Sequence, residues 1–288
     1  NRIRSIHSSL KIEANSLSLG QVRDVINGKI VLGKQKEIQE VKNAFDAYER
    51  IKEIDPYDIE ELKKYHGIMT KYVVDISGEF RNSDEEVFDD RGRCIFIASP
   101  PYLVPSLMDD LFNWMQDEKD NTYPLILSCI FHYKFVFIHH FCDGNGRIAR
   151  LWHTTPLSKW KPIFEYIPLE SQIEKFQDDY YSAIAKCHVL GESTLFIEFM
   201  LSQIDKILDD ISKQVNEDIE QIDPNIKKLL DVMEDDVSYS SNELMQKLNL
   251  KAKEGFRRDY LRPAIDQNLI YMTIPNKPKS KNQKYRKK

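Results

Sequence analysis

The sequence predicts a mainly α-helical protein with one β-hairpin, followed by a small domain that has the pattern of a winged helix. Apolar residues recur at helical spacing through most of residues 1–222. Two short apolar runs flank the turn signal Asp90-Arg91-Gly92 and predict a hairpin at about residues 87–97. Three helical patterns and a strand–turn–strand pattern follow the linker signal Gln221–Pro224 and predict a winged helix over residues 223–288.

Helix periodicity and breakers place the elements in order along the chain. The first domain is expected to have helices at about residues 8–17, 34–51, 55–69, 107–115, 124–138, 173–185 and 196–215, and one that begins at the Gly144-Asn145-Gly146 turn. The second domain is expected to have helices at 226–233, 242–248 and 253–267, and strands at 269–274 and 282–286. Asp55-Pro56 is a helix start signal, and Ser240 and Glu243 have the spacing of a capping box. A kink is expected at Pro263.

Composition favours a folded protein in the cytoplasm. Of the 288 residues, 41% are hydrophobic and 30% are charged, which is enough apolar material for a sizeable core. No run of eighteen apolar residues is present, so no membrane span is expected. The four cysteines show no CxxC spacing, which favours reduced thiols over a disulfide framework or a zinc site.

The segment His139–Arg150, with the sequence HHFCDGNGRIAR, carries the clearest chemical signal. Gly144 and Gly146 allow a tight turn whose backbone N–H groups form an anion-binding nest. The next helix begins there, so its dipole also favours phosphate. Arg147 and Arg150 lie three residues apart on the first helical turn, where two guanidinium groups can bind one polyphosphate.

Two further residues complete the predicted site. Asp143 supplies one carboxylate beside the nest, which suits Mg²⁺ because this ion takes one or two protein carboxylates and completes its shell with phosphate oxygens and water. His139 precedes the loop and can accept a proton from an attacking hydroxyl. Singly, each feature has a structural interpretation, such as a packed His or a helix connector. Cations at a helix start are unfavourable unless an anion lies nearby, so the combination favours phosphate binding.

This segment resembles the signature of the Fic family, His-Pro-Phe-x-(Asp/Glu)-Gly-Asn-Gly-Arg-x-x-Arg, with His140 in place of the usual Pro. The resemblance covers most of residues 5–215. Three further stretches look like family features around the flap hairpin and downstream of the signature: Gly78-Glu79-Phe80-Arg81, Pro100-Pro101 with Val104-Pro105, and Tyr180-Tyr181. Many relatives also carry a C-terminal winged helix. The resemblance therefore implies a helical Fic domain over residues 1–222 and a winged-helix domain over 223–288.

The resemblance implies a protein adenylyltransferase, which transfers AMP from ATP to a Ser, Thr or Tyr hydroxyl of a target protein and releases pyrophosphate. His139 would be the catalytic base, and Asp143 would hold Mg²⁺ between the α and β phosphates. The implied nucleotide-binding residues are Gly144, Asn145, Gly146, Arg147 on the β phosphate side, Arg150 on the γ phosphate, Tyr180 and Tyr181. One of the two tyrosines would pack and the other would border the adenine. The flap at about residues 87–97 would bind the target backbone by strand addition.

The segment Ser9–Asn15 resembles the inhibitory motif of the family, Ser/Thr-x-x-x-Glu-Gly/Asn. Ser9 and Glu13 are four residues apart and would share one face of a helix. Glu13 would form a charge-assisted pair with Arg150 and so occupy the γ phosphate position. Ala14 stands where the motif prefers Gly or Asn, and because Ala is a good helix former we expect the helix to continue through it.

Several alternatives stay open. The same loop fits hydrolytic removal of AMP from a modified protein, with Glu13 positioning water, and it also fits transfer of UMP or phosphocholine. An alternative of another class is a DNA-binding regulator that senses nucleotide, because residues 225–288 carry a net charge of +7 and the remainder −12. The basic residues around the expected recognition helix and wing are Lys251, Lys253, Arg257, Arg258, Arg262, Lys277, Lys279, Lys281, Lys284 and Arg286. A protein-docking module fits the same residues, and a homodimer is also left open.

Overall fold

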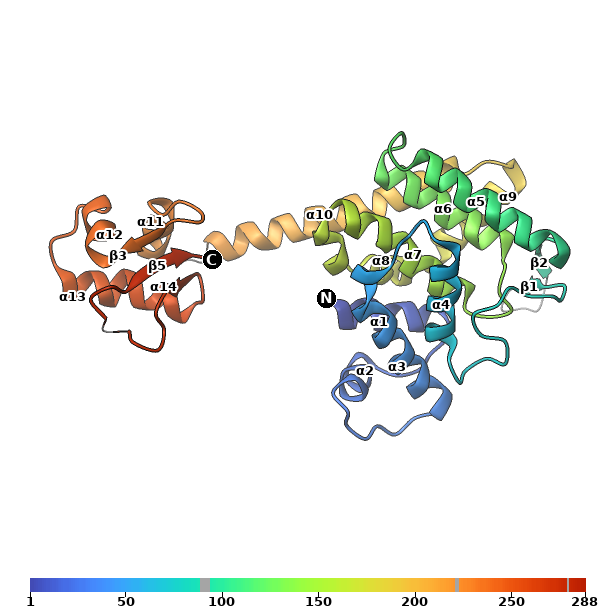
Figure 1. The fold of residues 1–288 in the computed structure, drawn as a ribbon, viewed down its shortest axis with the longest axis horizontal. Helices are drawn as coiled ribbons and strands as arrows, with labels where there is room; N and C mark the ends of the chain where they lie inside the picture. The colour runs from blue at the N-terminus through green and yellow to red at the C-terminus, as the bar shows by residue number, and fades with distance from the viewer. Residues whose placement is uncertain (89–93, 221–222, 279) are drawn as a thin grey trace. The chain divides into compact units, whose positions relative to one another are not determined.

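The structure of the chain, a computed structural model, describes residues 1–88, 94–220, 223–278 and 280–288. These residues form two compact units, Asn1–Asp209 and Asp210–Lys288 (Figure 1). The predicted fold class, mainly helical with one hairpin and a small C-terminal domain, is confirmed. The division between the two units falls inside α10 (Thr194–Glu220).

The first unit is built from helices and one two-stranded sheet. Its helices are α1 (Arg2–Ile12), α2 (Leu19–Ile26), α3 (Gln35–Glu49), α4 (Ile59–Thr70), α5 (Val104–Glu118), α6 (Pro124–Ile138), α7 (Asn145–Trp160), α8 (Leu169–Lys175), α9 (Gln177–Leu190) and the first part of α10. Three short 3₁₀ turns accompany them: η1 (Ile51–Glu53), η2 (Pro101–Leu103) and η3 (Pro162–Tyr166). Among the described residues, no helix combines the length and the apolar character that a bilayer crossing requires.

The core of the first unit is centred on α6 and α7, which pack against each other. Helix α6 begins at Pro124, where the missing N–H of Pro has no intrahelical partner to lose, and it buries Phe131 and Phe135 completely. Helix α7 buries Trp152, whose indole N–H donates to the Pro56 carbonyl oxygen at 3.0 Å. Because the two helices are consecutive, their packing fixes the loop that joins them.

Two helix boundaries differ from the sequence-based expectation. Helix α1 covers residues 2–12 rather than 8–17, because the chain turns at Ala14, where φ is 63°. Helix α4 begins at Ile59 rather than at Asp55-Pro56, because the carboxylate of Asp58 accepts a hydrogen bond from the Glu60 N–H at 2.8 Å and caps the helix there.

One helix was missed and another was predicted as continuous when it is divided. Helix α2 was not predicted, although Ser18 and Gln21 form a complete capping box at its start. The single helix expected at 173–185 is two helices, α8 and α9, because Phe176 leaves helical geometry with φ of −118°. The remaining helices of this unit lie close to the predicted ranges.

The predicted hairpin is present. Strands β1 (Glu86–Phe88) and β2 (Cys94–Ile97) pair in antiparallel register, with Val87 opposite Phe96 and an irregularity before Phe88. The turn signal Asp90-Arg91-Gly92 lies outside the described residues. Phe96 on β2 contacts the ring of His188 on α9 at a centroid distance of 4.5 Å, so the hairpin packs against α9.

The second unit contains the helices and the hairpin that were expected of a winged helix. Its elements are α11 (Pro224–Asp231), β3 (Ser238–Ser240), α12 (Ser241–Lys247), α13 (Lys253–Phe256), the π-helical turn η4 (Arg257–Leu261), α14 (Arg262–Asp266), β4 (Ile270–Met272) and β5 (Lys284–Lys287). Strand β3 was not predicted, and it pairs with β5 in an antiparallel sheet of order β3-β5-β4. The capping box of Ser240 and Glu243 is confirmed. The π-helical turn ends two residues before Pro263. Because Pro263 has no backbone N–H, the regular helical hydrogen-bond pattern is interrupted at this point.

Some of the predicted basic residues of this unit are already paired with acidic neighbours. Arg258 pairs with Asp259 at 2.7 Å, and Arg286 pairs with Asp236. Lys251, Lys253 and Arg257 are exposed. Lys279, like Gln221 and Ile222 of the predicted linker, lies outside the described residues.

Candidate active site

The loop between α6 and α7 is held in an uncommon backbone conformation. His139 ends α6 with φ of 53°, and Gly144 precedes α7 with φ of 81°, both in the left-handed region. A Cβ atom on Gly144 would lie 2.9 Å from Cγ2 of Thr70, so glycine is required for space as well as for conformation. A left-handed residue other than glycine persists when its surroundings fix it, and several contacts do so here.

Arg81 is one of these contacts, and it is 2% exposed. Its Nε donates to the His139 carbonyl oxygen at 2.6 Å, and its backbone N–H donates to the His140 carbonyl oxygen at 2.9 Å. Its two terminal nitrogens donate to the carbonyl oxygens of Ser83 and Ser99, on either side of the β1–β2 hairpin. Arg81 therefore joins the ends of the hairpin to the start of the loop.

His66 on α4 supports the middle of the same loop. The Gly78 N–H donates to Nδ1 of His66 at 2.9 Å, so this nitrogen is unprotonated and Nε2–H donates to the Asp143 carbonyl oxygen at 2.9 Å. The ring also stacks on Phe141 at a centroid distance of 3.5 Å. Burial lowers the pKa of His66 to about 4, which keeps this neutral tautomer at neutral pH.

The side chain of Asn145 braces the loop internally. Its amide donates to the Phe141 carbonyl oxygen at 2.6 Å and accepts from the Phe141 N–H at 3.0 Å. Both ends of the amide are thus bonded to the backbone of Phe141, which fixes the orientation of the Asn145 side chain.

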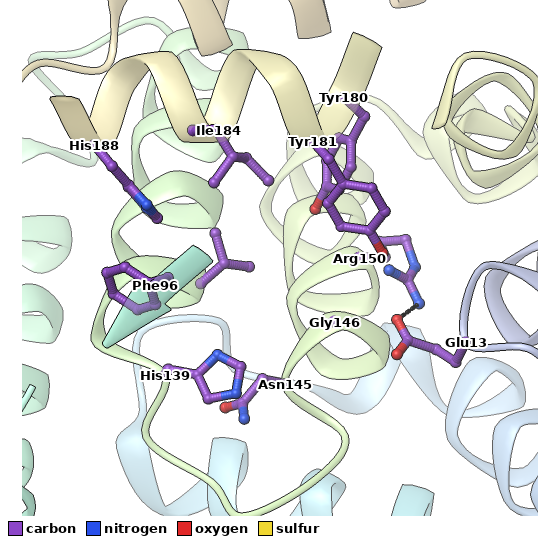
Figure 2. Close-up of a pocket in the computed structure, with 12 residues that line it drawn as sticks. Glu13, Phe96, His139, Asn145, Gly146, Arg150, Tyr180, Tyr181, Ile184 and His188 are labelled. Atoms are coloured by element: carbon purple, nitrogen blue, oxygen red, sulfur yellow. Dashed lines mark hydrogen bonds and ion pairs between the residues drawn. The ribbon is translucent and has the colours of Figure 1, made fainter. Parts of the chain in front are cut away.

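A cavity of about 230 Å³ lies beside the loop (Figure 2). Its lining residues are Glu13, Phe96, Val136, His139, Asn145, Gly146, Arg150, Tyr180, Tyr181, Ile184, Ala185 and His188. Glu13 and Arg150 lie at one side of this view, and Phe96, Ile184 and His188 lie at the other. The cavity therefore brings most of the predicted site residues together and has one charged and one apolar end.

His139 lines this cavity in a state suited to accept a proton. Burial, followed by the positive charge of Arg81, lowers the pKa of His139 below its usual value. The imidazole is therefore neutral at neutral pH, which is the form that a general base requires.

Glu13 occupies the charged end of the cavity. Its Oε1 accepts a hydrogen bond from Arg150 at 2.7 Å, and Arg150 is 2% exposed. Ser9 accepts two more hydrogen bonds from Arg150, at 3.1 Å through its Oγ and 2.9 Å through its carbonyl oxygen. A Cβ on Gly146 would lie 2.3 Å from Glu13 Oε1, so the carboxylate rests directly on this glycine at the start of α7. The predicted pairing of Glu13 and Arg150 is present in the structure.

The backbone around Glu13 corrects one expectation. Glu13 is the cap residue after α1, and Ala14 has φ of 63° instead of continuing the helix. The Ala14 N–H donates to the Lys11 carbonyl oxygen at 3.0 Å, and the Asn15 N–H donates to that of Leu10 at 3.1 Å. These two bonds form a Schellman motif, in which the left-handed residue is usually Gly or Asn. The preference of the inhibitory motif for Gly or Asn at this position thus has a conformational cause.

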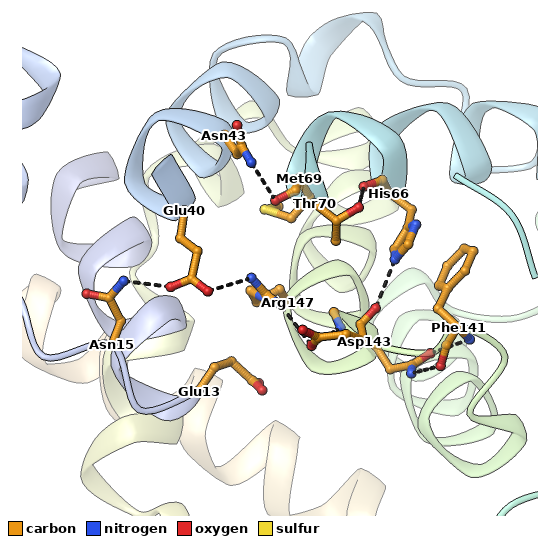
Figure 3. A network of polar contacts seen from close by, with 12 residues as sticks. Glu13, Asn15, Glu40, Asn43, His66, Met69, Thr70, Phe141, Asp143 and Arg147 are labelled. Carbon is orange, nitrogen blue, oxygen red and sulfur yellow. Dashed lines mark hydrogen bonds and ion pairs between the residues drawn. The ribbon is translucent and has the colours of Figure 1, made fainter. Parts of the chain in front are cut away.

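A second polar network surrounds Arg147 (Figure 3). One terminal nitrogen of Arg147 donates to Asp143 Oδ1 at 2.9 Å, and the other lies 3.4 Å from Glu40 Oε1. Glu40 Oε2 accepts a hydrogen bond from the Asn15 amide at 2.8 Å. Arg147 is buried, whereas the Asp143 side chain is 44% exposed. The predicted arginine therefore lies between the predicted metal ligand and a carboxylate of α3.

Asp143 fits the donor set that Mg²⁺ prefers. Its Oδ1 accepts from the Gly144 N–H and from Arg147, and its Oδ2 has no hydrogen-bond partner within the described part of the chain. Among the described residues, no group of three or more His, Cys, Asp or Glu side chains is arranged to hold a metal. A site with one carboxylate, completed by phosphate oxygens and water, agrees with this arrangement.

Tyr180 and His140 are buried, whereas Tyr181 is exposed. Tyr180 is 2% exposed and its hydroxyl lies 2.8 Å from Nε2 of His132, whereas Tyr181 is 45% exposed. His140, which replaces the usual Pro, is fully buried among the rings of Phe80, Phe135 and Phe141. His140 therefore serves as part of the core, and it does not line the cavity.

Sequence reasoning missed several residues that shape the site, namely Glu40, the roles of His66 and Arg81, and the cavity residues Phe96, Val136, Ile184, Ala185 and His188. On α9, the spacing of Tyr181, Ile184, Ala185 and His188 is that of one helical face, so this signal was available. His66 lies in an apolar stripe of α4, where a polar ring that needs partners was a second signal.

Comparisons with known proteins show what this chain is similar to. The Fic/DOC family model matches residues 56–157, and the model of the C-terminal domain of filamentation-induced-by-cAMP Fic-like proteins matches residues 224–287. The chain is 28% identical over 207 residues to protein adenylyltransferase fic-1 of Caenorhabditis elegans, which covers 68% of this chain and 38% of that protein. It is 26% identical over 215 residues to protein adenylyltransferase Fic of Drosophila melanogaster, covering 71% and 41%. The chain thus spans about two fifths of the length of these curated relatives.

A solved structure covers the whole chain. It is the crystal structure of a Fic family protein from Desulfovibrio desulfuricans G20, which has 40% sequence identity and a TM-score of 0.70. The match covers 100% of this chain and 86% of that one, so it includes both compact units. With the signature loop, the hairpin and the C-terminal unit all in place, the chain belongs to the Fic family.

Proposed function

We propose that this chain is a protein adenylyltransferase, which transfers AMP from ATP to a hydroxyl of a target protein. The observation that carries the proposal is the cavity, where a neutral His139 and the start of α7 face the same space and a carboxylate already rests at the anion site. Carboxylates and phosphates bind helix N-termini for the same electrostatic reason. The curated relatives are named protein adenylyltransferases.

The two ends of the cavity suggest how the nucleotide lies. The apolar end, with Phe96 and Ile184, suits a base, and the charged end, with Gly146 and Arg150, suits phosphates. At about 230 Å³ the cavity is smaller than the roughly 300 Å³ at which ligand pockets begin. Displacement of the Glu13 carboxylate would enlarge it at the charged end.

The proposed reaction uses few residues. His139 removes the proton from a Ser, Thr or Tyr hydroxyl of the target, and the resulting oxygen attacks the α phosphorus of ATP. The bond from the α phosphorus to the bridging oxygen breaks, pyrophosphate leaves, and AMP stays on the target. Mg²⁺, held at Asp143, would neutralise charge on the phosphates. Gly146 and Arg150 hold the phosphates in line, and positioning of this kind supplies much of the rate.

The resting structure supports inhibition by Glu13. With its carboxylate on Gly146 and Arg150, the γ phosphate of ATP has no access to the guanidinium group. ATP would then bind with its phosphates displaced, and a displacement of ~1 Å can lower the rate about 10²-fold. The target would approach along β1 and β2, where the exposed Ile97 and the nearby Tyr102 offer apolar contact.

Labelling with ATP that carries a radioactive α phosphate tests the proposal. The wild-type chain is expected to label itself and a lysate weakly, and Glu13→Gly is expected to label both strongly. Arg150→Ala should not activate, because it removes the phosphate contact together with the inhibitory one. Absence of labelling by Glu13→Gly, together with release of AMP from a previously modified target, would replace this proposal with the hydrolytic alternative.

A further inference from the structure

We infer that Glu40 is a positioning residue that keeps Arg147 from competing with Mg²⁺ for Asp143. This inference rests on the proposed function, since it concerns the metal that accompanies ATP. The carboxylate of Glu40 and that of Asp143 lie on two sides of one buried guanidinium group (Figure 3).

The charges around Arg147 explain why a second carboxylate matters. The Arg147 side chain is 3% exposed, so it depends on protein carboxylates for charge compensation. Within the described part of the chain, Asp143 and Glu40 are the carboxylates within 4 Å of it. A divalent cation bound to Asp143 would repel the positive charge of Arg147 and would compete with it for the Asp143 carboxylate. Glu40 would then be the carboxylate that balances the charge of Arg147.

A hydrogen bond from Asn15 fixes the orientation of the Glu40 carboxylate. Its Oε2 accepts from the Asn15 amide, whose nitrogen also donates to the Glu37 carbonyl oxygen at 3.2 Å. The Asn15 side-chain oxygen accepts from the Leu17 N–H at 3.1 Å, so the amide orientation is determined. Oε1 of Glu40 is thereby left facing Arg147. Glu40 acts on Asp143 through Arg147, and residues that hold a metal ligand from outside its coordination shell commonly change metal affinity by about 10–100-fold when they are removed.

Without Glu40, Arg147 would have Asp143 as its remaining carboxylate partner and would bind it more tightly. The metal would then have to displace this ion pair. Nucleotide binding without metal should change little or improve, because a negative charge near the phosphates has been removed. Glu40 therefore sets the metal-dependent part of ATP affinity, and this part can be measured separately from turnover.

The test compares ATP binding with and without metal by calorimetry. The background is Glu13→Gly with His139→Ala, which frees the anion site and prevents turnover. The ratio of the dissociation constant in EDTA to that in saturating Mg²⁺ measures the contribution of the metal. Adding Glu40→Gln is expected to lower this ratio at least about tenfold. Glu37→Gln is the matched control, because Glu37 lies on the same helix and pairs with Ser16 and Lys34 rather than with Arg147.

The possible outcomes separate the two proposals. A lower melting temperature with an unchanged ratio would show that Glu40 only stabilises the fold, and would overturn the inference. An equal fall with Glu37→Gln would overturn it as well, since a general charge effect would then be responsible. Absence of any ATP binding in the background variant would refute the proposed function and this inference with it. An active Glu13→Gly enzyme with an unchanged ratio would refute the inference alone.

Discussion

Replacing Glu13 with Gly should destabilise the resting protein while making it more responsive to ATP. Arg150 is 2% exposed, and Glu13 is its carboxylate partner within the described residues. Removing one member of a buried pair costs about 3–5 kcal/mol. Ser9 still accepts two hydrogen bonds from Arg150, and Glu13 is 31% exposed, so we expect a loss of about 1–3 kcal/mol.

This loss can be measured as a melting temperature. A change of 1 kcal/mol shifts the midpoint by roughly 2–4 °C in a domain near this size, so Glu13→Gly should melt several degrees below the wild type. ATP with Mg²⁺ at about 100 times its dissociation constant adds about 2.7 kcal/mol to the variant, and much less to the wild type, where Glu13 competes for the site. In ATP with Mg²⁺, Glu13→Gly should therefore melt at nearly the same temperature as the wild type or above it.

A surface ion pair between α1 and α8 provides the control. Lys11 on α1 pairs with Glu174 at 2.7 Å, and Lys11 is 56% exposed. Glu174→Gln should cost less than about 1 kcal/mol and should leave the ATP response as in the wild type. Equal ATP-induced shifts in the wild type and Glu13→Gly would refute the claim that Glu13 occupies a phosphate position, and an unchanged melting temperature without ATP would refute the claim that Arg150 depends on it.

Three further predictions concern the cavity itself. In the Glu13→Gly background, His139→Ala should lower AMP transfer by about 10²–10⁴-fold while ATP binding by calorimetry is retained, and loss of binding would show a structural role instead. Because the pKa of His139 is lowered, kcat/KM should hold its plateau down to a pH below 6.5 and fall at more acid pH as the ring gains a proton. Ile184→Trp should fill the apolar end and weaken ATP binding at least about tenfold, whereas the exposed Val189→Trp should not. Equal affinities for these two variants would contradict the proposed orientation of the nucleotide.

The sequence predicted the signature loop well because its chemistry is contiguous. Gly144, Gly146 and Arg150 lie within seven residues of one another, and local spacing alone places the two glycines at a helix start. The pairing of Glu13 and Arg150 was also predicted, although it joins residues that are far apart, because a resemblance supplied the partner. Where no such resemblance existed, distant partners such as Glu40 and Arg147 could not be found.

The helix boundaries that were predicted wrongly share a physical cause. Asp55-Pro56 has the composition of a helix start, but Asp58 is a second capping carboxylate and lies nearer to the apolar stripe of α4. The sequence alone does not show which of the two carboxylates caps the helix. The break at Phe176 has no Gly or Pro to mark it. In both places tertiary packing selects among local conformations that differ by about 1 kcal/mol.

The end of α1 shows how such a local choice determines the position of a functional group. Had the helix continued through Ala14, as helix propensity suggested, the segment after Glu13 would have run on in line with α1. Instead the left-handed turn at Ala14 directs Asn15 toward α3, where its amide reaches Glu40. Glu13 is thereby held on one side by the Schellman bonds to Leu10 and Lys11 and on the other by the contact of Asn15 with Glu40. The carboxylate on Arg150 is thus fixed by a backbone turn as well as by its own ion pair, and the left-handed conformation, unfavourable for Ala, is stabilised by both.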